Sequence, residues 1–165
     1  MTFGIFADYC IENGMAREIT REEANEILRK AEEQGLVHCS TNEKTTNLFI
    51  CNCCGCCCGV LRSVNKYNIP TAMTKSNYYA SIDPDECTGC ESCVDRCQVN
   101  AIQVQDGSVK IEKARCIGCG LCVSACPTEA ISMAHKEKED ISVIFPDSIA
   151  LLQAIGKEKG KAFPF

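Results

Sequence analysis

Residues 87–127 read CTGCESCVDRCQVNAIQVQDGSVKIEKARCIGCGLCVSACP, and their cysteine spacing decides the fold. The spacing C-x2-C-x2-C-x3-C occurs twice in this stretch. The first run is Cys87, Cys90, Cys93 and Cys97, and the second is Cys116, Cys119, Cys122 and Cys126, followed by Pro127. Because cysteine runs with this spacing hold cubane iron–sulfur clusters, we expect two [4Fe-4S] clusters.

The fourth cysteine of each run has a different task from the other three. Three thiolates spaced by two residues wrap a short loop around one cubane, and the remaining iron needs a more distant ligand. In the bacterial pattern the fourth cysteine supplies it to the other cluster. We therefore assign cluster one to Cys87, Cys90, Cys93 and Cys126, and cluster two to Cys97, Cys116, Cys119 and Cys122.

The two runs also form an internal repeat, in which Gly118 follows Gly89 by 29 positions. Each half is expected to contain a strand, a cluster-binding loop, a short helix and a second strand, related by a pseudo-twofold axis. Residues 102–105 and 109–112 alternate apolar and polar side chains around Asp106-Gly107-Ser108. This alternation predicts a β-hairpin between the two cysteine runs.

On these motifs, residues 79–135 resemble the bacterial two-[4Fe-4S] ferredoxin family. The resemblance implies an α+β fold with two small antiparallel hairpins around the clusters, and one-electron transfer at low potential. The family has proline after the fourth cysteine of both runs, whereas this chain has Pro127 but Gln98. The lost proline adds a backbone N–H near Cys97, which either shifts the potential of that cluster or merely loosens a turn.

Composition sets the limits on the rest of the chain, which has 165 residues, sixteen cysteines and a formal net charge of −5. Small cores of this size usually need metal ions for stability. We expect an α+β protein in which a small, mainly helical, cysteine-rich domain precedes the ferredoxin-type domain. The predicted segments are a cysteine-rich domain at 1–70, a linker at 71–77, the ferredoxin domain at 78–138 and a covering segment with a helix at 139–165.

Cysteine usage and charge also indicate a compartment and a class of partner. The N-terminal stretch is interrupted by Asp8 and Glu12 and does not resemble a signal peptide, so we expect a reducing, anaerobic cytoplasm rather than disulfides. The sequence contains no apolar run long enough for a membrane span. An acidic surface suits a basic patch on a reductase or oxidoreductase subunit and argues against nucleic acid.

The N-terminal part carries clear helix and hairpin signals. Thr20 and Glu23 form a capping-box pattern, and Gly35 ends the apolar periodicity, which predicts a helix at 21–34. Short apolar runs at 36–39 and 47–50 predict a hairpin. The sequence further predicts a short helix within 3–12, a helix within 60–67 and a last helix that begins at 146–148.

Residues 51–58, CNCCGCCC, hold six cysteines that are too close together for relaxed disulfides. We predict a third centre that draws on Cys51, Cys53, Cys54, Cys56, Cys57 and Cys58. An iron–sulfur centre is favoured because Cys51, Cys54 and Cys57 copy the triad spacing of the ferredoxin runs, while Cys53 and Cys56 offer a second register. Zinc and redox-active thiols remain open. Further ligand candidates are Cys10, Cys39 and His38.

The order of a capped helix, the CNCCGCCC stretch and two cluster motifs is similar to that of some iron–sulfur proteins of anaerobes. The resemblance implies no particular reaction. No phosphate-binding loop or dinucleotide motif is present, and only two histidines are available for acid–base chemistry. We therefore expect an electron carrier or an electron-delivering subunit without catalytic residues. The alternative is a small redox enzyme or a redox sensor whose reactive centre is the cysteine-rich stretch.

Overall fold

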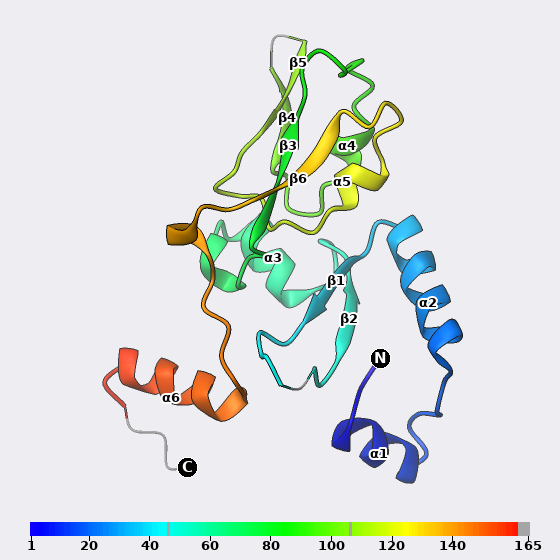
Figure 1. Ribbon diagram of the computed structural model, residues 1–165, viewed down its shortest axis with the longest axis vertical. Coiled ribbons are helices and arrows are strands. Elements are labelled where there is room, and N and C mark those ends of the chain that lie inside the picture. Colours follow the sequence, from blue (N-terminus) through cyan, green and yellow to red (C-terminus); the bar gives the residue numbers. More distant parts are fainter. Residues whose placement is uncertain (46, 106, 162–165) are drawn as a thin grey trace. The chain divides into compact units, whose positions relative to one another are not determined.

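A computed structural model describes residues 1–45, 47–105 and 107–161, and it combines helices with short two-stranded sheets (Figure 1). The helices are α1 (Ile5–Glu12), α2 (Arg21–Glu33), α3 (Gly59–Lys66), α4 (Ser92–Arg96), α5 (Leu121–Ser124) and α6 (Ser148–Glu158), with 3₁₀ turns at Pro70–Ala72 and Lys138–Asp140. The strands are β1 (Val37–Ser40), β2 (Ile50–Cys53), β3 (Tyr78–Ile82), β4 (Ile102–Gln105), β5 (Ser108–Ile111) and β6 (Ile131–His135).

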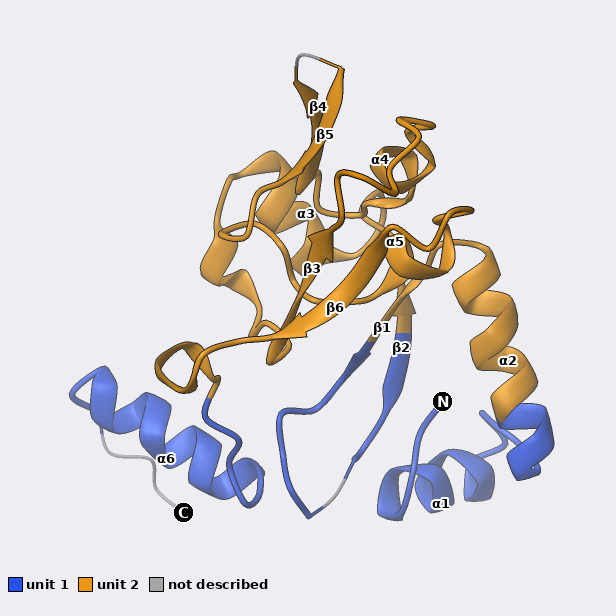
Figure 2. Ribbon diagram, turned by 45° about the horizontal axis from the view of Figure 1, so that its top comes forward, with its two compact units in different colours: residues 1–24, 39–51, 143–165 blue, residues 25–38, 52–142 orange. Residues whose placement is uncertain are grey.

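The chain divides into two compact units, each assembled from separate stretches of sequence (Figure 2). Unit 1 comprises residues 1–24, 39–51 and 143–165, and unit 2 comprises residues 25–38 and 52–142. This grouping cuts across the four consecutive segments that the sequence suggested. Within the described residues, every buried apolar side chain of the core lies in unit 2.

The cysteine runs lie in unit 2 between two antiparallel strand pairs. Strand β3 pairs with β6 from Tyr78↔His135 to Ile82↔Ile131, and β4 pairs with β5 from Ile102↔Ile111 to Gln105↔Ser108. The second pair is the hairpin that the alternating pattern predicted, although Asp106 of its turn lies outside the described residues. Chain order is β3, loop, α4, β4 and then β5, loop, α5, β6, so each cysteine run lies between two strands.

Apolar side chains fill the space between these elements. Ile102 at the start of β4 and Ile131 at the start of β6 are both buried. The other buried apolar residues of this region are Ala80, Val99, Ala101, Val109, Ile117, Leu121 and Ala130. Most of these side chains are small, and the side chains of Cys93, Cys116 and Cys122 are buried along with them.

Helix α2 begins at Arg21 as its sequence signals predict, and it ends at Glu33, one residue before the predicted end. The backbone N–H of Glu23 donates to Thr20 Oγ1 at 3.2 Å, which caps the first turn. The Glu23 carboxylate pairs with the Arg17 guanidinium. At the other end Gly35 adopts φ +74°, and the next N–H, that of Leu36, donates to Ala31 O at 2.9 Å.

The cysteine-rich stretch joins a strand to a buried helix. Strand β2, which pairs with β1, ends at Cys53, and α3 begins at Gly59 with Cys58 as its N-cap. Helix α3 buries Leu61 and Val64 almost completely, at 0% and 1% exposure. The loop at 54–58 is therefore anchored through a helix that is part of the core.

In unit 1 the C-terminal segment is extended before α6. The Asn42 side chain donates to Val143 O, and Glu43 and Phe145 form an isolated parallel bridge. Helix α6 begins after Asp147, whose Oδ1 accepts from the Ala150 N–H at 2.8 Å. Among the helices that the structure describes, none has the length and apolar character needed to cross a membrane.

Candidate metal centres

A small cavity beside β3 and β5 gathers cysteines from both runs. Its sulfur-bearing residues are Cys87, Cys90, Cys93 and Cys126. The rest of the wall combines the apolar side chains of Ile82, Val109 and Ile131 with the polar residues Thr88, Glu91 and Thr128. The fourth cysteine of the second run thus lies with the first three cysteines of the first run.

A second cavity has the reciprocal composition. Its cysteines are Cys97, Cys116, Cys119 and Cys122. The remaining wall is apolar and includes Ile102, Ile117 and Leu121. Four thiols on an apolar wall fit a cluster that binds thiolates and excludes water.

Burial raises the pKa of the Cys93 and Cys122 thiols, so their thiolate forms are disfavoured unless a cation is bound. Cys93, Cys116 and Cys122 are 6%, 8% and 7% exposed. Burial, and secondarily the neighbouring thiols of Cys119, Cys116 and Cys97, raise the pKa of Cys122 to about 12. Iron ions compensate the negative charge of bound thiolates, so the donor set suits an iron–sulfur cluster and does not suit free thiolates.

Hydrogen bonds reach sulfur atoms in both cavities. The Ala101 N–H donates to Cys97 Sγ at 3.2 Å. In the other cavity Cys90 Sγ lies 3.5 Å from Ser92 Oγ, and Cys126 Sγ lies 3.7 Å from Thr128 Oγ1. Such contacts to cluster sulfurs help to set the reduction potential.

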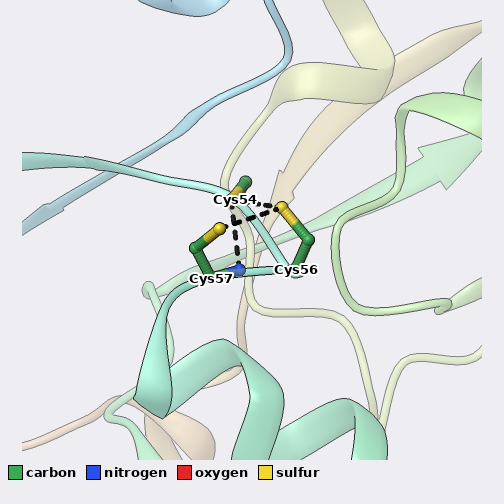
Figure 3. A group of neighbouring side chains, drawn as sticks. All are labelled: Cys54, Cys56 and Cys57. Atoms are coloured by element: carbon green, nitrogen blue, oxygen red, sulfur yellow. Dashed lines mark hydrogen bonds between the residues drawn. The ribbon is translucent and has the colours of Figure 1, made fainter.

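A third group of thiols lies in the loop between β2 and α3. Figure 3 shows that the side chains of Cys54, Cys56 and Cys57 converge. Their Sγ atoms all lie within 4.8 Å of one another, with 2.7 Å between Cys54 and Cys56 and 3.6 Å between Cys56 and Cys57. The Cys57 N–H also donates to Cys54 Sγ at 3.3 Å. We call these three residues the thiol triad.

The contacts inside the thiol triad shift the pKa values of Cys54 and Cys56 in opposite directions. The hydrogen bond from the Cys56 thiol, followed by that from the Cys57 backbone N–H, lowers the pKa of Cys54 to about 7. The hydrogen bonds that Cys56 makes to Cys54 and Cys57 raise the pKa of Cys56 to about 11. Cys54 therefore becomes a thiolate, the form that binds metals, more readily than Cys56.

The other candidate ligands have different positions. Cys53 ends β2 and Cys58 caps α3, and neither belongs to the tight group of three. His38 Nδ1 lies 2.8 Å from Asn52 Oδ1, which is the hydrogen-bonded arrangement of a structural histidine. The remaining candidates belong to unit 1, and they are Cys10, Cys39 and Cys51. The i, i+3 spacing suggested Cys51 with Cys54 and Cys57, whereas the tight turn groups Cys56 with Cys54 and Cys57.

Comparison with known families agrees with the cysteine motifs. Residues 80–133 match a family model described as a 4Fe-4S dicluster domain, and a second model with the same description matches residues 115–158. A search of curated proteins found no match. The chain therefore contains a ferredoxin-type two-cluster segment, and it also carries a cysteine-rich unit at residues 53–58.

Proposed function

We propose that the protein transfers single electrons at low potential through two [4Fe-4S] clusters, as a carrier or as the electron-delivering subunit of an anaerobic oxidoreductase. One observation supports this most directly: each of two cavities is lined by four cysteines, three from one run and one from the other. Cluster one then takes Cys87, Cys90, Cys93 and Cys126, and cluster two takes Cys97, Cys116, Cys119 and Cys122. Ferredoxin-type domains typically carry electrons and do not catalyse reactions.

The chain's own residues supply three things to this function. The thiolates fix each cluster, the apolar walls keep water from most of it, and the N–H and O–H groups near sulfur adjust its potential. Cys90 and Cys119 are exposed, which gives each cluster an edge that faces solvent. A redox partner can bring its own cofactor near such an edge.

Charge supports a protein partner of basic character. The formal net charge is −5, and acidic carriers meet complementary basic patches at faster rates. We propose reductase or oxidoreductase subunits as partners, in a reducing cytoplasm. The three convergent thiols of the thiol triad support a third metal centre in the same chain.

The exchange of the fourth cysteine is tested by replacing Cys97 with alanine. Cluster two loses one of its four ligands, so we expect the iron content of the two clusters to fall from about eight toward about four per chain. Cluster one should survive with its low-potential signal. Iron analysis and electron paramagnetic resonance (EPR) of the reduced protein measure both quantities under anaerobic conditions.

Double variants identify which cluster is lost. Adding Cys119→Ala to Cys97→Ala should remove no further iron, because both residues serve cluster two. Adding Cys90→Ala instead should remove nearly all the cluster iron, because Cys90 serves cluster one. The reverse pattern would show that Cys97 binds to the cluster of its own run.

The function itself is tested by voltammetry of the intact protein. Two one-electron couples at negative potential are the expected result. A protein with assembled clusters that shows no reversible reduction would contradict an electron-transfer role.

A further inference from the structure

The loop that carries the thiol triad is attached to the residue that follows Cys97. The Gly55 N–H donates to Gln98 Oε1 at 2.7 Å, and the side-chain amide of Asn65 donates to Gln98 O at 2.7 Å. Both hydrogen bonds are partly buried. Gln98 therefore forms hydrogen bonds both to the cysteine loop and to helix α3, the helix that follows this loop.

The backbones approach so closely that only glycine fits at position 55. A Cβ atom on Gly55 would lie 2.6 Å from Gln98 O and 2.9 Å from Asn65 Nδ2. The first distance is to backbone, which cannot move aside as a flexible side chain can. Gly55 lies between Cys54 and Cys56, so this close approach fixes the triad itself.

Gln98 is also the position at which the chain departs from the ferredoxin pattern. Proline at this position has no side-chain oxygen and would not accept the Gly55 N–H. On the other side of Gln98, the Cys97 sulfur accepts from the Ala101 N–H at 3.2 Å. The ligand proposed for cluster two is thus followed directly in the sequence by the residue that holds the triad loop.

The spacing within the triad suits one metal ion. Sulfurs around a single tetrahedral ion, at the zinc–sulfur distance of about 2.3 Å, lie about 3.8 Å apart. The triad sulfurs lie within 4.8 Å of one another, with 3.6 Å between Cys56 and Cys57. The Cys54 and Cys56 sulfurs, at 2.7 Å, would move apart by about 1 Å on binding the ion. Ligand sulfurs of a cubane lie further apart, because each binds outward to a different iron. Among the described residues, the eight cysteines of the two runs form no group this tight.

We propose that Cys54, Cys56 and Cys57 bind a single soft divalent ion, and that Gln98 is the positioning residue that holds this ion next to cluster two. The proposal deepens the proposed function and rests on its third metal centre. Three thiolates suit Zn²⁺ or Fe²⁺, and a further ligand completes the tetrahedron. A fixed neighbour of this kind couples magnetically to cluster two whenever the ion is paramagnetic.

Metal binding is tested first, on the full chain with its clusters in place. Brief treatment with a chelator empties the exposed site, and iron analysis verifies that the clusters remain. Anaerobic titration with Co²⁺ should then give thiolate-to-cobalt absorption that saturates at one equivalent per chain. The Cys54→Ser, Cys56→Ser, Cys57→Ser triple variant should show none of this absorption.

Positioning is tested by the effect of bound Co²⁺ on the EPR signal of the reduced clusters. In the native protein Co²⁺ should speed relaxation of that signal severalfold. Gln98→Pro and Gln98→Ala should lose most of this enhancement while still binding one Co²⁺. Gln98→Glu should keep it, because its carboxylate still accepts the Gly55 N–H. If Gln98 had only a structural role, Gln98→Glu and Gln98→Ala would show the same relaxation enhancement once both variants had bound Co²⁺.

The outcomes separate the inference from the function on which it rests. Absence of triad-dependent cobalt binding would reject the third centre of the proposed function. Binding of one Co²⁺ with equal relaxation in native protein and Gln98→Ala would overturn the role of Gln98 and leave electron transfer intact. Native protein with an additional four irons and sulfides that depend on the triad would replace the single ion by a third cubane.

Discussion

The Gly118→Ala variant is expected to lose cluster two and to be less stable than the native protein by about 3–5 kcal/mol, in the range of severe backbone and overpacking changes. Gly118 adopts φ +70°, and a Cβ atom there would lie 2.2 Å from Tyr78 O and 2.8 Å from Ser76 Cβ. Tyr78 belongs to β3, whose pairing with β6 limits any movement of that carbonyl. The loop between Cys116 and Cys119 must shift instead.

The internal repeat provides a matched control for this variant. Gly89 occupies the same place in the first run and adopts φ +69°. Among the residues that the structure describes, only Gly107 O lies within 4.0 Å of a Cβ added there. Gly89→Ala should therefore cost only the strain of a left-handed alanine, about 1–2 kcal/mol. Anaerobic denaturant unfolding, followed by cluster absorption, measures both variants. Equal losses at the two glycines would contradict the role assigned to crowding at Gly118.

This pair of glycines also shows what the repeat predicts and what it does not. Equivalent positions in the two runs predict equivalent backbone conformation, and the two φ angles differ by only one degree. The surroundings differ because the segment before β3 packs on the second loop, where the Ser76 N–H donates to Ile117 O. The repeat does not predict a contact between Ser76 and Ile117, because these residues lie far apart in the sequence.

Local signals predicted the secondary structure well. The cap at Thr20 and the glycine at position 35 placed both ends of α2, because each acts on hydrogen bonds within one turn. The alternation of apolar and polar residues in 102–105 and 109–112 predicted the hairpin in which Ile102 pairs with Ile111. A period of two residues fixes which side chains of a strand face the core. The hairpin of β1 and β2 is shifted by one to three residues toward the C-terminus, since the cysteines of 51–53 extend the second strand.

The assembly of unit 1 was beyond the reach of sequence patterns. Its stretches are joined by hydrogen bonds such as Asn42 to Val143 O and Thr45 to the backbone of Pro146. These bonds involve backbone carbonyls, which every residue has, so nothing in the composition indicates the partners. Four consecutive segments were the natural interpretation of the sequence, and a discontinuous unit requires knowledge of these long-range pairs.

The cysteine-rich stretch illustrates the same limit within a few residues. Spacing by three favoured Cys51, Cys54 and Cys57, by analogy with the cluster loops. The turn places the Cys56 sulfur 2.7 Å from the Cys54 sulfur, because the Cys57 N–H donates a hydrogen bond back to the Cys54 sulfur. The departure at Gln98 was visible in the sequence, but its bonding partner Gly55 lies 43 positions away.

Removal of iron is expected to unfold the cluster-bearing part of unit 2 cooperatively. Apolar residues of β3, β4, β5 and β6 line the two cavities, and the thiols of Cys93, Cys116 and Cys122 are buried with them. Without iron these walls would enclose two voids or would have to admit water. In such small sites the free energy of metal binding contributes directly to the free energy of folding. For a structural zinc ion this contribution is about 10 kcal/mol.

Hydrogen exchange measures this directly after chelation under reducing, anaerobic conditions. Amides of β3, β4, β5 and β6 should lose their protection together, whereas those of α6 in unit 1 serve as an internal reference. Reconstitution with iron and sulfide should restore protection, which separates loss of metal from irreversible oxidation of the thiols. Because the strands pair through their own backbone hydrogen bonds, a chelated protein that kept native protection in β3 and β6 would show that the apolar core suffices without the clusters.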